Sequence, residues 1–160
     1  MNECDYEFYT IHASSLTDDT LVSGNTFTNY LFNSIKDVVE VNILVADFDA
    51  RSSGSNVCYL NVDELSSRFN DITGNSSISA NPSTRSQITN PVAIFVVDST
   101  GRTTYKETDY VSKTYYYTPI RKIDRLTIRL RDSNGNLIPM DSNDVHISFS
   151  FKCKRTNMCY

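Results

Sequence analysis

Two aspartates close to one apolar stretch are the first candidates for chemistry in this chain. Asp47 and Asp49 flank Phe48 at the end of a run of alternating apolar residues. Side chains two apart in a strand point to the same side, so both carboxylates would face one way, as a metal ion or an acid–base pair requires. The other interpretation is a strand end kept soluble by its charges. We expect this second role.

A second acidic group has the oxygen-rich composition that calcium prefers. It runs from Asp132 to Asn136, and Asp141 and Asp144 follow it. Its glycine stands at the fourth position instead of the sixth, so it is not an EF-hand loop. The same residues suit a tight turn, because Gly and Asn adopt positive φ at little cost. We expect no cofactor and no metal, and calcium binding in this loop stays an open alternative.

The remaining signals for catalysis are weak. The two histidines, His12 and His146, fall in a terminal segment and on the polar side of a strand pattern, and we expect surface roles for both. The motifs Gly-x-Ser-x-Gly, His-Glu-x-x-His, Gly-x-x-x-x-Gly-Lys and Gly-x-Gly-x-x-Gly do not occur. We therefore expect a protein that is not an enzyme.

Three consecutive tyrosines, 115–117, precede Arg121 and Lys122 and suggest stacking of bases or sugars. In a strand such residues alternate faces, so at most two share a surface. The net charge of -4 and the pI near 5.1 also argue against a nucleic-acid partner, which requires a clustered cationic face. Tyrosine is enriched at protein interfaces, and we expect Tyr115 and Tyr117 to be subunit contacts.

The elements that must position these residues are strands. Period-two alternation appears in several segments, and Ser, Thr, Asn, Tyr and Val are plentiful while Ala and Leu are sparse. We predict core strands at 35–48, 92–97, 126–131 and 144–152, one short helix at 63–69, and a polar surface loop at 71–90. A chain of 160 residues suits one domain. The predicted fold is an all-β antiparallel sandwich with one short helix.

The first 28 residues have a different character. Tyr6, Phe8 and Ile11 are apolar, but turn-prone polar residues follow them. We interpret residues 1–28 as an edge strand or as an extended arm that lies on a neighbouring subunit, and residues 29–160 as the domain. Tyr6, Phe8 and Ile11 are therefore expected assembly contacts.

No segment predicts export or membrane insertion. The first residues contain no cationic segment followed by an apolar run, and no stretch is long and apolar enough to span a bilayer. The four cysteines, at 4, 58, 153 and 159, are not spaced as a disulfide framework and suit reduced thiols in a cytosolic compartment. Whether Cys153 and Cys159 pair stays open.

The stretch 126–153 also carries a resemblance. It reads as a strand Leu-x-Ile-x-Leu, then Asp-x-x-Gly-Asn-Leu-Ile, a polar loop with acidic residues, and the strand Val-His-Ile-Ser-Phe-Ser-Phe. This pattern resembles the C-terminal end of small jelly-roll capsid components, the minor capsid and penton proteins, of large icosahedral DNA viruses of eukaryotes. The likeness covers the last third of the chain and extends loosely to residues 29–48.

The resemblance implies a single jelly roll that serves as a virion structural protein, either a penton or a minor capsid subunit. Its implied partners are the major capsid protein and other capsid components, with copies of itself in a homo-oligomer, a pentamer if it is a penton. The implied location is the capsid, assembled in the host cytoplasm. The residues leave open a rival function, a β-sandwich that binds a glycan or a host protein.

Overall fold

The computed structural model describes the residue ranges 6–16, 20–23, 25–50, 56–66, 91–98, 100–139 and 144–155. Its strands are β1 (Tyr6–Ser14), β2 (Thr20–Ser23), β3 (Thr26–Asp49), β4 (Val57–Val62), β5 (Ala93–Val96), β6 (Arg102–Lys106), β7 (Lys113–Asp132) and β8 (His146–Lys154). One 3-10 turn, η3 (Asp63–Leu65), is the only helix within these ranges.

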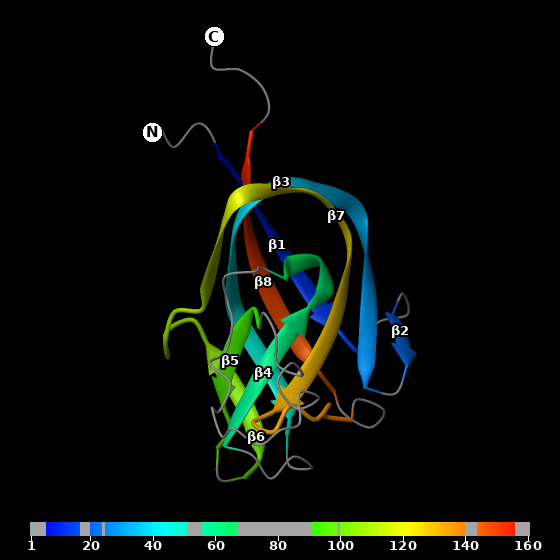
Figure 1. Cartoon of the computed structure of the whole chain (residues 1–160), viewed down its shortest axis with the longest axis vertical. Coiled ribbons are helices and arrows are strands. Elements are labelled where there is room, and N and C mark those ends of the chain that lie inside the picture. The colour runs from blue at the N-terminus through cyan, green and yellow to red at the C-terminus, as the bar shows by residue number, and fades with distance from the viewer. Residues whose placement is uncertain are drawn as a thin grey trace, which may run out of the picture.

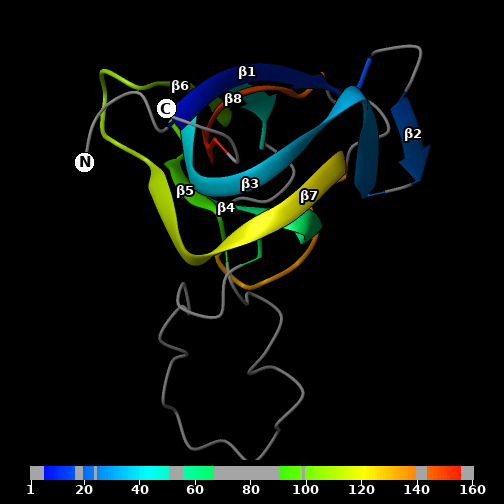
Figure 2. The same cartoon turned by 90° about the horizontal axis from the view of Figure 1, so that it is seen from above.

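The strands form one antiparallel sheet that curls on itself. Neighbouring strands follow the order β1-β8-β3-β7-β4-β5, and β2 and β6 pair with β3. β3 and β7 arch together over the upper end of the molecule (Figure 1). Viewed from above, β1 and β8 lie on one side and β4 and β5 on the other (Figure 2). The predicted all-β antiparallel sandwich is confirmed.

The two layers share their longest strand. The first part of β3 pairs with the end of β7 at Phe27–Tyr30, while its later part pairs with β8 at Val38–Asp47 and with β6 at Val45–Asp49. One layer contains β1, β8, later β3, early β7 and β6, and we call it the outer layer. It faces the layer of early β3, late β7, β4 and β5. Bending within β3 is what moves the chain from one layer to the other.

Inward side chains from both layers fill the space between them. The Phe95 ring of β5 lies 5.5 Å from Phe48 of β3 and 5.3 Å from Tyr105 of β6, between ring centroids. All three side chains are buried. Because aromatic pairs at such distances add to the free energy of burial, this cluster ties the edges of the two layers together.

The last strand follows the predicted alternation. Val145, Ile147, Phe149 and Phe151 are buried, and the intervening residues of β8 are half-buried or exposed. Regular pairing with β1 over nine residues keeps this period intact. The pattern read from the sequence was sufficient here because no bulge interrupts the β1–β8 ladder.

The predicted core strand 35–48 does not alternate regularly to its end. Regular alternation would place Val45 on the same face as Val41 and Ile43. Instead Val45 is 42% exposed and Ala46 is buried. The β3–β8 register shifts between Ile43 and Val45. A bulge adds one residue to one strand and moves every later side chain to the opposite face.

A proline commonly ends or borders a strand, but Pro119 does not end the strand that begins at Lys113. β7 continues through it to Asp132. The β3–β7 ladder breaks between the pairs Val38–Ile120 and Glu40–Tyr115, so Pro119 lies where the register shifts. A proline is tolerated at such a bulge because it lacks only a backbone donor that the ladder does not use there.

The predicted core strand 92–97 has one exposed face. A continuous apolar run such as 91–97 predicts a strand buried on both faces or a hairpin arm. However, Ile94 and Val96 are 47% and 67% exposed. β5 pairs with β4, and β6 pairs with β3 instead of with β5. The run is an edge strand, and its outer face meets solvent.

The polar residues 132–136, at the end of β7, form a turn. Asp132 Oδ1 accepts hydrogen bonds from the backbone N–H groups of Asn134 and Asn136, at 2.8 and 2.9 Å, and Asp132 is 5% exposed. Gly135 has a φ of 85°, which glycine adopts without steric cost. The sequence predicted this turn correctly.

Some predictions fall partly or wholly outside the described residues. The predicted helix at 63–69 is present only as the short η3, which covers Asp63–Leu65. The predicted loop at 71–90 lies outside the described residues, as do Asp141, Cys4 and Cys159. Within the segment 1–28, β1 is an edge strand paired with β8, and the proposed boundary after residue 28 falls inside β3.

Candidate functional site: an aromatic patch on the outer layer

Four strands of the outer layer align four side chains in one row. Phe8 of β1 pairs with Lys152 of β8, Lys152 pairs with Glu40 of β3, and Glu40 pairs with Tyr115 of β7. Side chains opposite one another across a sheet project from the same face. The row therefore brings two aromatic residues, a cation and an anion onto one outer surface.

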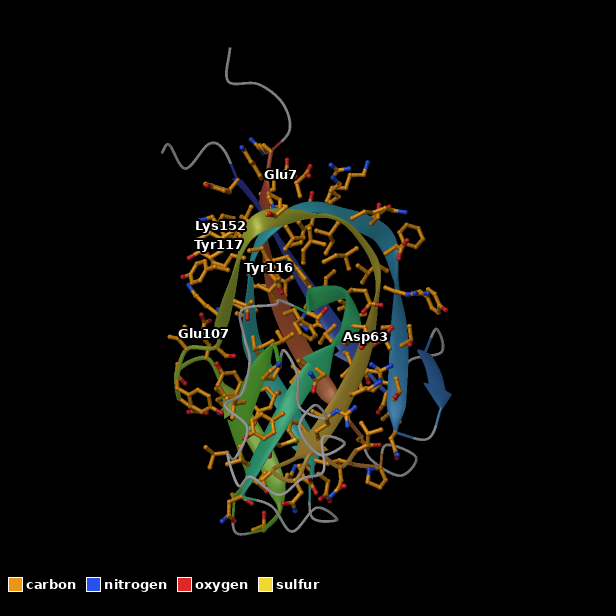
Figure 3. The ribbon with its side chains drawn as sticks, in the orientation of Figure 1. Glu7, Asp63, Glu107, Tyr116, Tyr117 and Lys152 are labelled. Carbon is orange, nitrogen blue, oxygen red and sulfur yellow. The ribbon has the colours of Figure 1, made fainter. Side chains whose placement is uncertain are left out.

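Two further tyrosines complete this surface. We call it the aromatic patch, and it consists of Tyr6, Phe8, Glu40, Tyr115, Tyr117 and Lys152. Phe8, Tyr115 and Tyr117 are 67%, 63% and 90% exposed. Figure 3 shows Lys152 and Tyr117 on the same flank of the molecule. Such exposure over several neighbouring aromatic residues marks an interaction surface more often than isolated apolar residues do.

Lys152 lies at the centre of the β1 half of the patch. Its Nζ atom is 4.2 Å from the centroid of the Tyr6 ring and 5.9 Å from that of Phe8. A cation over an aromatic face is worth about 0.5–1 kcal/mol when the pair is exposed. The lysine thus lies over two aromatic side chains of the patch.

Glu40 fixes the β7 half. Its Oε1 atom lies 3.4 Å from Lys113 Nζ, and its side chain is 17% exposed. Glu40, Val39, Lys152 and four tyrosines line a depression of ≈ 210 Å³; the tyrosines are Tyr6, Tyr115, Tyr116 and Tyr117. A carboxylate and an ammonium group at the base of an aromatic rim can each form a polar contact with a bound group.

The three consecutive tyrosines divide as predicted. Tyr115 and Tyr117 point outward, whereas Tyr116 is half-buried and packs against the core. The Tyr116 hydroxyl donates a 2.8 Å hydrogen bond to the carbonyl of Leu65, and burial raises its pKa. Tyr116 therefore joins β7 to η3, and its two neighbours provide the exposed rings.

Ile11 lies on the other side of the sheet from Tyr6 and Phe8. It pairs with Phe149 of β8 and packs against the core. Because faces alternate along a strand, residues 6 and 8 share one face and residue 11 occupies the opposite one. Of the five expected assembly contacts, the fold brings together Tyr6, Phe8, Tyr115 and Tyr117.

Sequence reasoning did not assign Lys152 and Glu40 to this surface. Both occupy the polar phase of their strands, which marked them as outward-facing. Their meeting with residues of β1 and β7 depends on registers between segments more than seventy residues apart in the chain. No local pattern in the sequence specifies such registers.

Two of the candidate catalytic residues, Asp47 and His12, have side-chain partners on neighbouring strands. Arg102 donates hydrogen bonds through Nε and Nη2 to the two carboxylate oxygens of Asp47, at 3.0 and 2.7 Å, and these bonds hold the pKa of Asp47 below its ordinary value. His12 Nδ1 lies 2.7 Å from Ser148 Oγ. Within the described part of the chain, no three His, Cys, Asp or Glu side chains gather as metal ligands would.

Comparison of the chain with known protein families and with curated proteins finds no match. Among the described residues there is no helix of the length and apolarity needed to cross a membrane.

Proposed function

We propose that the protein is a virion structural protein, a penton or minor capsid subunit of an icosahedral double-stranded DNA virus, and that it acts through protein–protein contacts. The observation that carries the proposal is the aromatic patch on the flank of a β-sandwich. It lies on the bodies of four strands instead of on loops. A shell subunit needs such lateral surfaces because neighbouring sandwiches meet side by side.

The order of strand pairing supports a single jelly roll. The first strand pairs with the last, early β3 with late β7, later β3 with β6, and β4 with β5. The pairings are thus nested from the ends of the chain toward its middle. Two Greek keys rolled together, the arrangement of a jelly roll, give this nesting.

The composition of the patch supports a protein partner. Tyrosine and phenylalanine are enriched where protein interfaces are fully buried, and charged residues are depleted there. In the patch, Glu40 is already paired with Lys113, and Lys152 lies against aromatic rings. The surface therefore offers apolar area whose charges are largely compensated.

The proposed partners are the major capsid protein and other capsid components, together with further copies of this chain. The protein would be located in the capsid after assembly in the host cytoplasm. Symmetric shells repeat each contact many times, so individual contacts smaller than those of a stable dimer are sufficient.

The second candidate function is a β-sandwich module that binds a glycan or a host protein. The depression beside Glu40 favours it, because aromatic rims and a carboxylate suit a sugar ring as well as a peptide. The two functions predict different losses when the patch is altered: incorporation into particles for the first, and binding of a glycan or host protein for the second.

The test is a double substitution, Tyr115→Asp with Tyr117→Asp, in the full chain expressed with the major capsid protein of its source virus. A matched control is Val96→Asp, because Val96 is 67% exposed but lies on β5, outside the patch. We expect both chains to fold and to melt at similar temperatures. The patch variant should be absent from assembled particles, while the control is incorporated. Electron microscopy and gel analysis of purified particles measure the incorporation.

Normal incorporation of the patch variant would contradict the proposed use of the patch. Failure of the unaltered chain to join any particle would contradict the capsid function itself. Loss of glycan-array binding by the patch variant with incorporation unchanged would favour the second function.

A further inference from the structure

Four of the described strands pair on one side only, and β1 differs from the other three. β2 and β5 are four residues long, and β6 is short and begins and ends with Arg102 and Lys106. β1 has nine residues, no Lys, Arg or Pro, and an unbroken register with β8. Proteins protect sheet edges by short strands, charged residues, prolines or bulges. The one such feature of β1 is Glu7, near its first residue.

The hydrogen bonds around Ser14 and Ser15 show which backbone groups of β1 face its open edge. Ser15 N–H donates to the Val145 carbonyl at 3.0 Å, toward the β8 side. Ser14 N–H instead donates to Asn29 Oδ1 at 2.9 Å, and the Ser14 carbonyl accepts from Asn29 Nδ2 at 3.1 Å. Since backbone groups alternate sides along a strand, the even-numbered residues of β1 direct theirs away from β8.

Phe8, Thr10 and His12 therefore direct their N–H and C=O groups to the open edge. All three residues are exposed, and no hydrogen bond joins these groups to another described residue. The Asn29 amide closes the edge at Ser14, in the same way that a neighbouring strand would. The open stretch is centred on Thr10.

We propose that the open edge of β1 binds β1 of a second copy of this chain, antiparallel, about a two-fold axis that passes beside Thr10. Thr10 would pair with its own counterpart, and Phe8 with His12 of the other copy. Each such pair exchanges two backbone N–H···O bonds. The two outer layers would then join into one continuous sheet. This inference does not depend on the proposed capsid function.

The side chains of β1 suit this self-pairing. On the outer face, Phe8 would lie beside His12 of the second copy, and the two Thr10 side chains would meet, a favourable cross-strand pair. On the inner face, Tyr9 would lie opposite Ile11 of the second copy, which extends the apolar row that Ile11 forms with Phe149. Glu7, the only acidic residue of β1, would lie opposite an alanine, so no like charges meet.

The first test is sedimentation of the purified chain over a range of concentrations that reaches the millimolar level, since a contact along one strand is small and weak. We expect a dimer in reversible equilibrium. Thr10→Pro removes the central edge donor but no bond to β8, because prolines are tolerated at edges. It should weaken the dimer by tenfold or more, while Thr10→Ala, which keeps the N–H group, should leave it within threefold.

The second test fixes the register without a proline. In a chain with serine at positions 4 and 159, Thr10→Cys should cross-link to its counterpart under mild oxidation, because paired Cα atoms are about 5.5 Å apart, within disulfide range. Phe8→Cys is the matched control. Its counterpart would be about 14 Å away along the strand direction, so it should cross-link at least tenfold more slowly.

A chain that stays monomeric at every concentration overturns the proposal, including the case in which β1 binds a foreign peptide instead. So does a dimer that persists in the Thr10→Pro variant, or equal cross-linking at positions 8 and 10.

Discussion

The outer layer has two faces built from the same strands, and they differ in how far their apolar side chains are buried. On its inner face Ile11, Phe149 and Ile43 form one row, and the latter two are fully buried. On its outer face Phe8 and Tyr115 stand in another row, each more than half exposed. The inner face is complete within the chain, whereas the outer face carries apolar area that the fold does not cover.

This difference separates stability from binding. Burying a large apolar side chain contributes about 1.5–3 kcal/mol, so the inner row accounts for much of the free energy of folding. An aromatic side chain that remains in solvent contributes little. Substitutions on the two faces should therefore have opposite consequences, one for unfolding and the other for binding.

The largest expected effect is on the inner face. Phe149→Ala should lower the free energy of unfolding by about 3–5 kcal/mol, because it removes a fully buried ring and leaves a cavity. Typical domains have only about 5–15 kcal/mol in total. Urea denaturation followed by circular dichroism measures the change. Ser150→Ala, next to it on the outer face, is the control and should change stability by less than about 0.5 kcal/mol. Equal effects at the two positions would show that the faces are assigned wrongly.

A buried polar side chain gives the next effect. Asp132→Ala removes the acceptor of the turn donors of Asn134 and Asn136, which should cost about 1–3 kcal/mol in the same denaturation measurement. Asp124→Ala is the matched control. Asp124 is exposed, and Lys122 is the partner that the structure describes for its carboxylate. An exposed ion pair of this kind is worth about 0–1 kcal/mol. If Asp132→Ala left the free energy of unfolding unchanged, the structural role of this carboxylate would be contradicted.

The inward thiols give a smaller effect that depends on pH. Burial raises the pKa of Cys58 to about 12 and that of Cys153 to about 11. An unfolded thiol titrates near about pH 8.5. The stability linked to these groups is therefore fully present below that pH and is lost as the pH rises toward the folded pKa values.

Urea denaturation at pH 8 and at pH 10 measures this loss of stability. Alkylation with iodoacetamide at pH 8, read by peptide mass spectrometry, checks the burial that causes it. The folded chain should leave Cys58 and Cys153 unmodified, and the chain in urea should be labelled at both. Labelling of either thiol at the same rate in the folded and unfolded chain would show that the residue is accessible.

The smallest effect on stability is expected on the outer face. Tyr117→Ala should change the free energy of unfolding by less than about 0.5 kcal/mol, because the side chain is 90% exposed. Thermal melting measures it, and Val111→Ala, another exposed apolar position, provides the comparison. A loss of several kcal/mol at Tyr117 would place this residue in the fold instead of at a contact surface.

The sequence predicted what depends on local pattern. The alternation of β8 and the turn at Gly135 follow from residue types alone, and so does the division of Tyr115 and Tyr117 from Tyr116. The exposed Val45 could not be predicted, because a bulge in β3 reverses the faces without any local marker. The contact of Lys152 with Tyr6 and Phe8 could not be predicted either, because it depends on the register between the first and last strands.

Hydroxyl-radical footprinting, read by mass spectrometry on the free chain and on the chain within particles, tests the central claim most directly. The claim is that the aromatic patch on the outer face binds partners, whereas the exposed face of β5 stays in solvent. Tyr115 and Tyr117 should become protected from oxidation in particles, and Val96 on β5 should react equally in both states. Equal oxidation of the two tyrosines in the free and particle-bound chain would contradict the account.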